Sequence, residues 1–128
     1  MKHIWYERNE FVRDFIPAGS IVDFGCGQRE ILDFVTPTEY LGIDCNEHAD
    51  IYHDLNEPLV LDKQYDDFYM LASMIGVNNT LENPHEIIRV NTALIYNSLE
   101  WVKNNSVNNL LFTSTSECYS GTIDKFGY

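Results

Sequence analysis

The sequence predicts an α/β fold, a three-layer sandwich in which helices cover both faces of a mostly parallel sheet of about five strands. Short apolar runs with the length of strands alternate with segments of helical periodicity, as in repeated strand–helix–strand units. Several of these runs are apolar nearly throughout, which is typical of parallel strands buried on both faces. The chain has 128 residues, and we expect residues 1–128 to form a single domain.

The first half of the chain is expected to hold two helices and three strands. Residues 4–16 place apolar side chains on one helical stripe, and Pro17 and Gly19 end that helix. A buried strand follows over 20–25 and a short helix over 27–35. Two further strands are expected over 40–44 and 49–55.

The second half contains the clearest helix of the sequence. A strand over 65–73 precedes it, and a last strand is expected over 110–116. Asn83 is suited to the N-cap of this helix, Pro84 to its first turn and Glu86 to a capping box, so we expect the helix to run to about Lys103. Its predicted buried stripe contains Ile87, Ile88, Leu94, Ile95, Leu99 and Val102. This order of elements is Rossmann-like, and it is compatible with a truncated version of that fold.

Charge and composition restrict the partners. The formal net charge is −12, from 20 acidic and 8 basic residues, and the basic residues do not cluster. Such a chain repels phosphate backbones and anionic membranes, so we expect a small-molecule ligand and no nucleic acid. No apolar run approaches the ~18 residues that cross a bilayer, and the first residues lack the apolar core of a signal peptide, so we expect a cytoplasmic protein. Cys26, Cys45 and Cys118 are too widely spaced to predict a disulfide framework or a metal site.

The segment "DFGCGQ", residues 23–28, lies where the first strand should turn into its helix. In open parallel sheets, ligands bind beyond the carboxyl ends of the strands at this point. Gly25 and Gly27 allow close backbone approach, and a following helix would offer free N–H groups. The dinucleotide fingerprint has a third glycine where this chain has Glu30. A carboxylate beside a diphosphate is unfavourable, so the turn by itself argues against a nicotinamide dinucleotide.

Residues 18–61 resemble class I S-adenosylmethionine-dependent methyltransferases. Val22 to Gly27 match the apolar-Asp-apolar-Gly-Cys-Gly pattern of that family, and "YLGID" ends in Asp44, which matches its ribose-binding acid. In "ADIYHDLNEPL", Asp54 and Leu55 match residues beside the adenine. The resemblance implies S-adenosylmethionine as cofactor, a cation without phosphate that tolerates nearby acids. The residues it implies as cofactor-binding are Asp23, Gly25, Cys26, Gly27, Asp44, Asp54 and Leu55. The alternative is that the three acids only end strands and cap helices, and that Cys26 is a packing residue.

Residues 65–121 are similar to a second family, the extended short-chain dehydrogenase/reductases, which are NAD-dependent nucleotide-sugar epimerases and dehydratases. The similarity runs from "YDDFYMLAS" through "IRVN" to "FTSTSECY". It implies that Leu71, Ala72 and Ser73 flank the cofactor and that Asn91 is the helix asparagine of that family. Thr115 would be a catalytic residue that hydrogen-bonds the sugar, followed by the aromatic Tyr119.

Three departures weaken this second resemblance. Met70 replaces a usual histidine, the third glycine of the fingerprint is absent, and residues 1–128 contain no Tyr-x-x-x-Lys. That tyrosine is the general acid/base of the family, so we expect no epimerisation by this chain alone.

Three functions follow, with the chain read as a mosaic of a methyltransferase-like half (1–62) and an epimerase/dehydratase-like half (63–128). The main hypothesis is an S-adenosylmethionine-binding domain that methylates a small molecule, because the glycine turn and Asp44 choose the cofactor. The alternatives are a truncated NAD-dependent nucleotide-sugar epimerase/dehydratase and a non-catalytic Rossmann-like binding module. An open sheet edge at the last strand also suggests a homo-oligomer.

Overall fold

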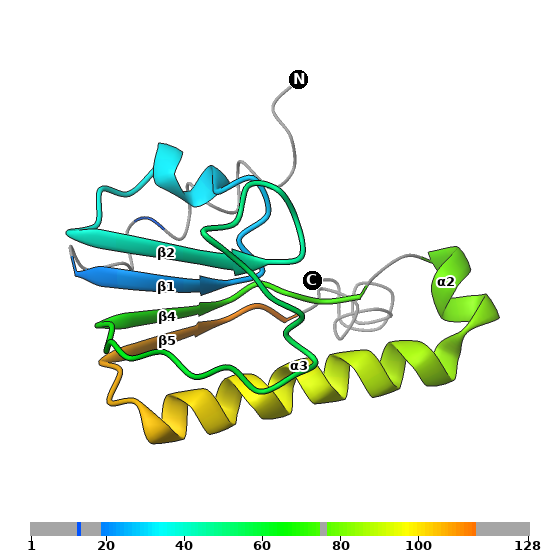
Figure 1. The fold of residues 1–128 in the computed structure, drawn as a ribbon. Coiled ribbons are helices and arrows are strands. Elements are labelled where there is room, and N and C mark those ends of the chain that lie inside the picture. The colour runs from blue at the N-terminus through cyan, green and yellow to red at the C-terminus, as the bar shows by residue number, and fades with distance from the viewer. Residues whose placement is uncertain (1–12, 14–18, 75–76, 115–128) are drawn as a thin grey trace, which may run out of the picture.

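The computed structural model describes Arg13, residues 19–74 and residues 77–114. Five parallel strands form one sheet in the order β3-β2-β1-β4-β5 (Figure 1). The strands are β1 (Ser20–Phe24), β2 (Glu39–Asp44), β3 (Ile51–Tyr52), β4 (Asp67–Met70) and β5 (Asn109–Phe112). The helical segments are η2 (Glu30–Asp33), α2 (Val77–Glu82) and α3 (Pro84–Asn104). The predicted α/β class and the parallel Rossmann-like sheet are therefore confirmed.

The register of the strands divides their side chains between two faces, because alternate residues of a strand point to opposite sides. One face, which we call the α3 face, packs against helix α3 and the segment between β3 and β4. Its buried residues are Val22, Phe24, Ile43, Leu55, Tyr65, Phe68, Met70, Leu94 and Trp101. The other, the η2 face, carries Ile21, Asp23, Tyr40, Gly42 and Tyr69, with Ile31 of η2 packed on it.

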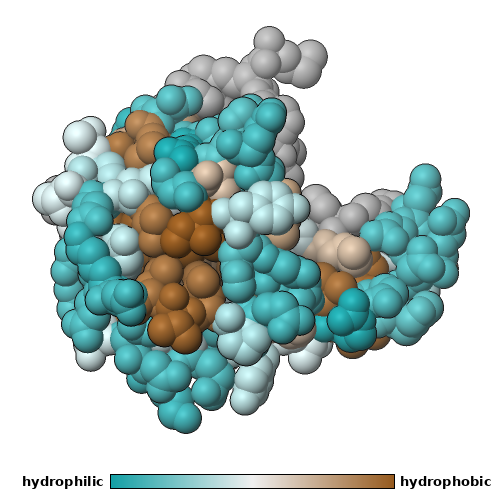
Figure 2. Space-filling model, in the orientation of Figure 1, coloured by the Kyte–Doolittle hydropathy of each residue, from teal (hydrophilic) through white to brown (hydrophobic). Residues whose placement is uncertain are grey.

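Helix α3 runs back antiparallel to the strands, while α2 lies beyond their carboxyl ends (Figure 1). The segment between β3 and β4 crosses the side that faces the viewer. On that side, Figure 2 shows apolar side chains gathered in one area with hydrophilic residues at its margins. None of the helices in the described ranges is long and apolar enough to span a membrane.

The predicted helix over 27–35 is wrong. Only four residues, Glu30–Asp33, are helical, and they form a 3-10 turn. Arg29, which precedes them, has a left-handed backbone with φ of 61°. A left-handed residue cannot belong to a right-handed helix, so no regular helix grows directly from the glycine turn.

Helix α3 begins at Pro84 and ends at Asn104, close to its predicted bounds. Asn83 occupies the N-cap position but makes no capping hydrogen bond with its side chain, and Glu86 pairs with Arg89 (2.6 Å) instead of closing a capping box. The predicted buried stripe is also partly wrong. The residues of α3 that are buried are Leu94, Ser98 and Trp101, whereas Ile88 and Leu99 are 67% and 51% exposed. The helix is thus rotated relative to the arc that apolar periodicity alone predicted.

The remaining differences concern lengths. Strand β3 has two residues where seven were expected over 49–55, and β4 and β5 are also shorter than predicted. Helix α2 was not predicted. The helix expected over 4–16 and the end of the last predicted strand lie outside the described residues.

Candidate functional site

The carboxyl ends of β1, β2 and β4 lie side by side and are followed by the segments that carry most of the predicted site residues. Residues 25–29 form the turn after β1, Asp44 is the last residue of β2, and residues 71–74 follow β4. The sequence thus places its glycine turn and its candidate ribose-binding acid at the same edge of the sheet.

Both glycines of the turn have a left-handed backbone, with φ of 85° at Gly25 and 55° at Gly27. A Cβ on Gly25 would lie 2.4 Å from the backbone nitrogen of Ala72. The backbone N–H groups of Leu71 and Ala72 both donate to the carbonyl oxygen of Phe24 (2.9 and 3.1 Å). Gly25 is therefore required where the turn after β1 meets the segment after β4.

The backbone N–H groups of this turn donate within the protein. Gly25 and Cys26 donate to the carbonyl oxygen of Ile43 (2.8 and 3.4 Å), and Arg29 donates to that of Cys26 (2.8 Å). Gly27 donates to Oδ2 of Asp44 (2.9 Å), and Gln28 donates to Oε2 of Glu30 (3.2 Å). Carboxylates of the chain itself thus hold the two N–H groups at the tip of the turn.

Asp44 joins the turn to the end of β2. Its Oδ1 accepts the backbone N–H of Cys45 (2.7 Å), while its Oδ2 accepts that of Gly27. A carboxylate has about four lone-pair acceptor positions, so these two bonds leave capacity for hydroxyl donors. The side chain is half-buried at the carboxyl edge. The ribose-binding role predicted for Asp44 stays a prediction.

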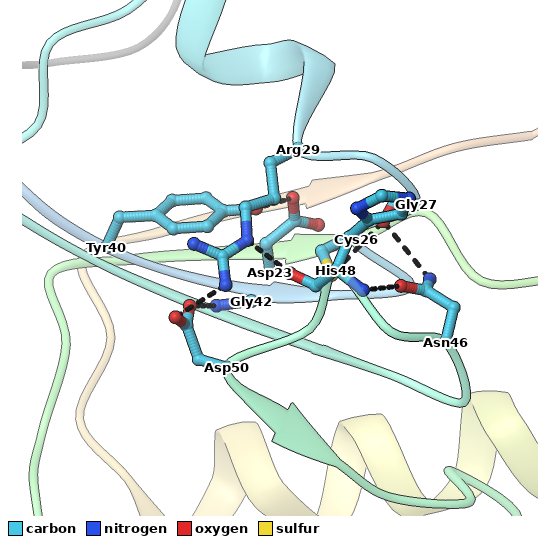
Figure 3. A network of polar contacts seen from close by, with 9 residues as sticks. All are labelled: Asp23, Cys26, Gly27, Arg29, Tyr40, Gly42, Asn46, His48 and Asp50. Atoms are coloured by element: carbon cyan, nitrogen blue, oxygen red, sulfur yellow. Dashed lines mark hydrogen bonds and ion pairs between the residues drawn. The ribbon is translucent and has the colours of Figure 1, made fainter.

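Arg29 connects the turn to the segment after β2 (Figure 3). Its guanidinium pairs with Asp50 (2.6 Å) and donates from Nε to the carbonyl oxygen of His48, and it lies 6.0 Å from the centre of the Tyr40 ring. The other carboxylate oxygen of Asp50 accepts the backbone N–H of Gly42 (2.8 Å).

A second link joins the same two segments. Asn46 donates from its side chain to the carbonyl oxygen of Gly27 (3.1 Å) and accepts the backbone N–H of His48 (2.8 Å) (Figure 3). Sequence reasoning missed Arg29, Asn46 and Asp50, because their partners are 8 to 21 residues distant and no local spacing identifies them.

Asp23 and Cys26 lie beneath the turn and are buried. Asp23 has no exposed surface, and its Oδ2 accepts the hydroxyl of Tyr40 (2.8 Å) on the η2 face. Burial, together with the nearby charges of Asp23 and Asp44, raises the pKa of the Cys26 thiol to about 12. The Cys26 sulfur is packed so close to Gly42 that a Cβ there would lie 2.9 Å from it. In this conformation both side chains support the turn from below, and neither offers a surface to a ligand.

Asp54 and Leu55 lie in the segment after β3. Asp54 is exposed, and its carboxylate accepts the backbone and side-chain N–H groups of Asn56 (2.9 and 2.8 Å), which lowers the pKa of Asp54. The Leu55 side chain is part of the core on the α3 face, and its carbonyl oxygen accepts the side chain of Asn97 (3.0 Å). Their predicted contacts with an adenine stay predictions.

The segment after β4 is held against α3 by Asn91. The Asn91 side chain accepts the backbone N–H of Met74 (2.7 Å) and donates to the carbonyl oxygen of Met74 (3.0 Å). This pair of bonds keeps half-buried Ala72 beside Gly25. Thr115, the predicted catalytic residue, and Tyr119 lie outside the described residues.

Within residues 13, 19–74 and 77–114, no group of three or more His, Cys, Asp or Glu side chains is arranged to hold a metal ion.

Residues 44–125 match the model of the NAD dependent epimerase/dehydratase family. No curated protein matches the chain. The match begins at Asp44, well before residue 65, where the predicted similarity to this family starts, and it includes Asp54 and Leu55. These residues had been assigned to a methyltransferase-like half, and a fused methyltransferase is not shown.

The match overturns the expected cofactor. S-adenosylmethionine was predicted from the glycine turn and Asp44, whereas the family to which Asp44 is matched uses NAD. The prediction treated one short turn as decisive, although a sheet of this topology serves several cofactors and the turn lies outside the matched range.

The residues present fit only part of NAD. Asp44 has acceptor capacity of the kind that ribose hydroxyls use. The diphosphate does not fit the turn as it stands, because the N–H groups that would bind it are taken and the carboxylate of Glu30 lies among them. A regular helix that would direct further N–H groups at a phosphate is also missing, since η2 has four residues.

Proposed function

This chain belongs to the NAD-dependent epimerase/dehydratase family, and we propose that it is a nucleotide-binding module that holds the ribose of an adenine nucleotide at the carboxyl edge of its sheet. The observation that carries the proposal is the position of Asp44. Its half-buried carboxylate ends β2, faces the glycine turn through the bond from Gly27, and keeps free acceptor capacity.

The surrounding residues support this role by fixing the carboxylate. The N–H groups of Gly27 and Cys45 hold its two oxygens, so the group loses little freedom when a ribose binds. Arg29 and Asn46 hold the turn and the segment after β2 at a set separation. The module therefore binds and orients a nucleotide with an acceptor that is already in place.

Asp44→Asn tests the proposal. The variant keeps the size of the side chain and one carbonyl acceptor, but it loses the charge and the second acceptor. We expect the affinity for adenosine, measured by isothermal titration calorimetry, to fall about tenfold, since a hydrogen bond to a charged group contributes ~1.5–3 kcal/mol.

The matched control is Glu47→Gln. The side chain of Glu47 is 89% exposed, and the variant removes a carboxylate from the loop that follows Asp44. It should bind adenosine like the parent chain. An Asp44→Asn variant with unchanged affinity and an unchanged circular dichroism spectrum would disprove the ribose-binding role, as would a parent chain that does not bind adenosine at millimolar concentration.

Family membership also supports a second candidate, NAD-dependent epimerase or dehydratase activity. Residues 1–128 lack the Tyr-x-x-x-Lys pair that the resemblance to extended reductases implies as general acid and base. We expect the purified chain to convert no nucleotide sugar when NAD is supplied, as measured by chromatography of the products. Turnover by this chain would show that other residues supply the acid and base.

A further inference from the structure

We infer that Glu30 excludes a diphosphate from the glycine turn, so that the site prefers a nucleoside without a diphosphate to a dinucleotide. The inference rests on the proposed function, because it concerns the ligand of the same site. It assigns the selectivity to one residue that stands where the dinucleotide fingerprint has its third glycine.

The first argument is the position of the Glu30 carboxylate. Its Oε2 accepts the backbone N–H of Gln28 (3.2 Å) and lies 3.3 Å from where a Cβ on Gly27 would stand. The carboxylate thus lies beside the space that the lack of a side chain at Gly27 leaves open. In a dinucleotide site this space admits the diphosphate.

The second argument is the state of the remaining donors. Gly25, Cys26 and Arg29 donate their backbone N–H groups to carbonyl oxygens, and Gly27 donates to Asp44. A diphosphate would therefore have to displace Glu30 to gain one N–H group, and would find the other four in use. Adenosine needs none of these donors, because its ribose hydroxyls donate to Asp44.

The third argument is charge. Glu30 and Asp44 bring two carboxylates to the turn, and the guanidinium of Arg29 is paired with Asp50. A diphosphate bound at this exposed turn would lie within a few ångströms of these two negative charges. Coulomb repulsion at that distance in a medium close to water corresponds to about a tenfold loss of affinity.

The experiment compares the affinities of adenosine and NAD for the parent chain, Glu30→Gln and Glu30→Gly by isothermal titration calorimetry. Glu30→Gln removes the charge and keeps an acceptor for Gln28, whereas Glu30→Gly restores the three-glycine spacing. The parent should bind adenosine at least as tightly as NAD. Both variants should bind NAD about tenfold more tightly than the parent does, and adenosine as before.

Controls separate this inference from the proposed function. Glu47→Gln removes an equal charge away from the turn and should leave the ratio of the two affinities unchanged. If adenosine binds but neither Glu30 variant changes that ratio, Glu30 is not the selective residue and the inference fails alone. If adenosine binds to no variant, the proposed function fails and the inference falls with it. Glu30→Gly decides the question if Glu30→Gln does not fold.

Discussion

The two faces of the sheet bury their residues by different means. On the α3 face, Phe68 lies between two aromatic neighbours, with ring centroids 4.7 Å from Phe24 and 5.3 Å from Trp101. On the η2 face, the buried carboxylate of Asp23 accepts the hydroxyl of half-buried Tyr40 under the glycine turn. Aromatic contacts thus hold the first face, whereas the second also contains a hydrogen bond to a buried carboxylate.

The difference indicates which face of the sheet lies next to the candidate site. The α3 face fixes the sheet, and any set of apolar side chains with the right volume would do so. On the η2 face, Cys26 and Tyr40 lie against Gly42 under the glycine turn, and Arg29 lies beside the Tyr40 ring. Changes on the α3 face should therefore affect mainly stability, while changes on the η2 face should also affect the site.

Trp101→Ala should give the largest effect on this comparison. Trp101 is 4% exposed and contacts Phe24 and Phe68, so its truncation leaves a cavity in the α3 face. We expect the free energy of unfolding to fall by about 3–5 kcal/mol in a urea titration. Tyr96→Ala, on the exposed side of the same helix, should change it by less than about 0.5 kcal/mol. Similar losses for both variants would mean that α3 does not pack as described.

Thiol alkylation should distinguish the buried η2 face from the surface. The pKa of Cys26 is raised to about 12, so at pH 8 about one thiol in ten thousand is ionised, and its rate should rise about tenfold per pH unit. We expect Cys26 to react with iodoacetamide at least about 100-fold more slowly than exposed Cys45, as measured by peptide mass spectrometry. The two should react alike in denaturant. Equal rates in the folded protein would show that the turn leaves Cys26 open to solvent.

Removal of the Tyr40 hydroxyl should show how the η2 face is held. Tyr40→Phe takes one hydrogen bond from the buried Asp23 carboxylate and should lower the free energy of unfolding by about 1–3 kcal/mol. A loss of less than about 0.5 kcal/mol would show that this hydrogen bond does not help to hold the η2 face.

Ser98→Ala should give the smallest effect. Ser98 is buried on the α3 face, and its hydroxyl donates to the sulfur of Met70 (3.1 Å), a weak acceptor. The higher helix propensity of alanine offsets part of the lost bond. We expect the free energy of unfolding, measured in a urea titration, to change by less than about 0.5 kcal/mol. A loss of stability as large as that of Tyr40→Phe would show that a polar contact contributes as much to the α3 face as to the η2 face.

Local pattern was sufficient for much of the fold. The alternation of apolar runs and helical segments predicted a parallel sheet, and Asn83 with Pro84 located the start of α3. The pattern could not predict how α3 is rotated about its axis. The stripe of apolar residues on this helix is wider than the surface that contacts the sheet, so the stripe does not show which of its residues are buried. Ile88 and Leu99 fit the predicted stripe and are exposed for this reason.

The candidate site was predicted less completely. The sequence identified Asp44, the two glycines and the departure at Glu30, since each depends on its place beside a strand end. It treated Asp23, Asp44 and Asp54 as equivalent acids. In the structure Asp23 is buried, Asp44 is half-buried at the end of β2, and Asp54 is exposed. It also chose the wrong cofactor, because one turn was given more weight than the longer similarity that follows it.

The sequence by itself determined the class of the sheet and located the glycine turn and Asp44 at the carboxyl ends of neighbouring strands. Only the tertiary structure decided that no regular helix follows the turn and that the chain's own carboxylates hold the N–H groups at its tip. The physical reason is distance along the chain. A residue's periodicity and turn preference are local, whereas Gly27 meets Asp44 across 17 residues and Arg29 meets Asp50 across 21, contacts that exist only when the strands lie side by side.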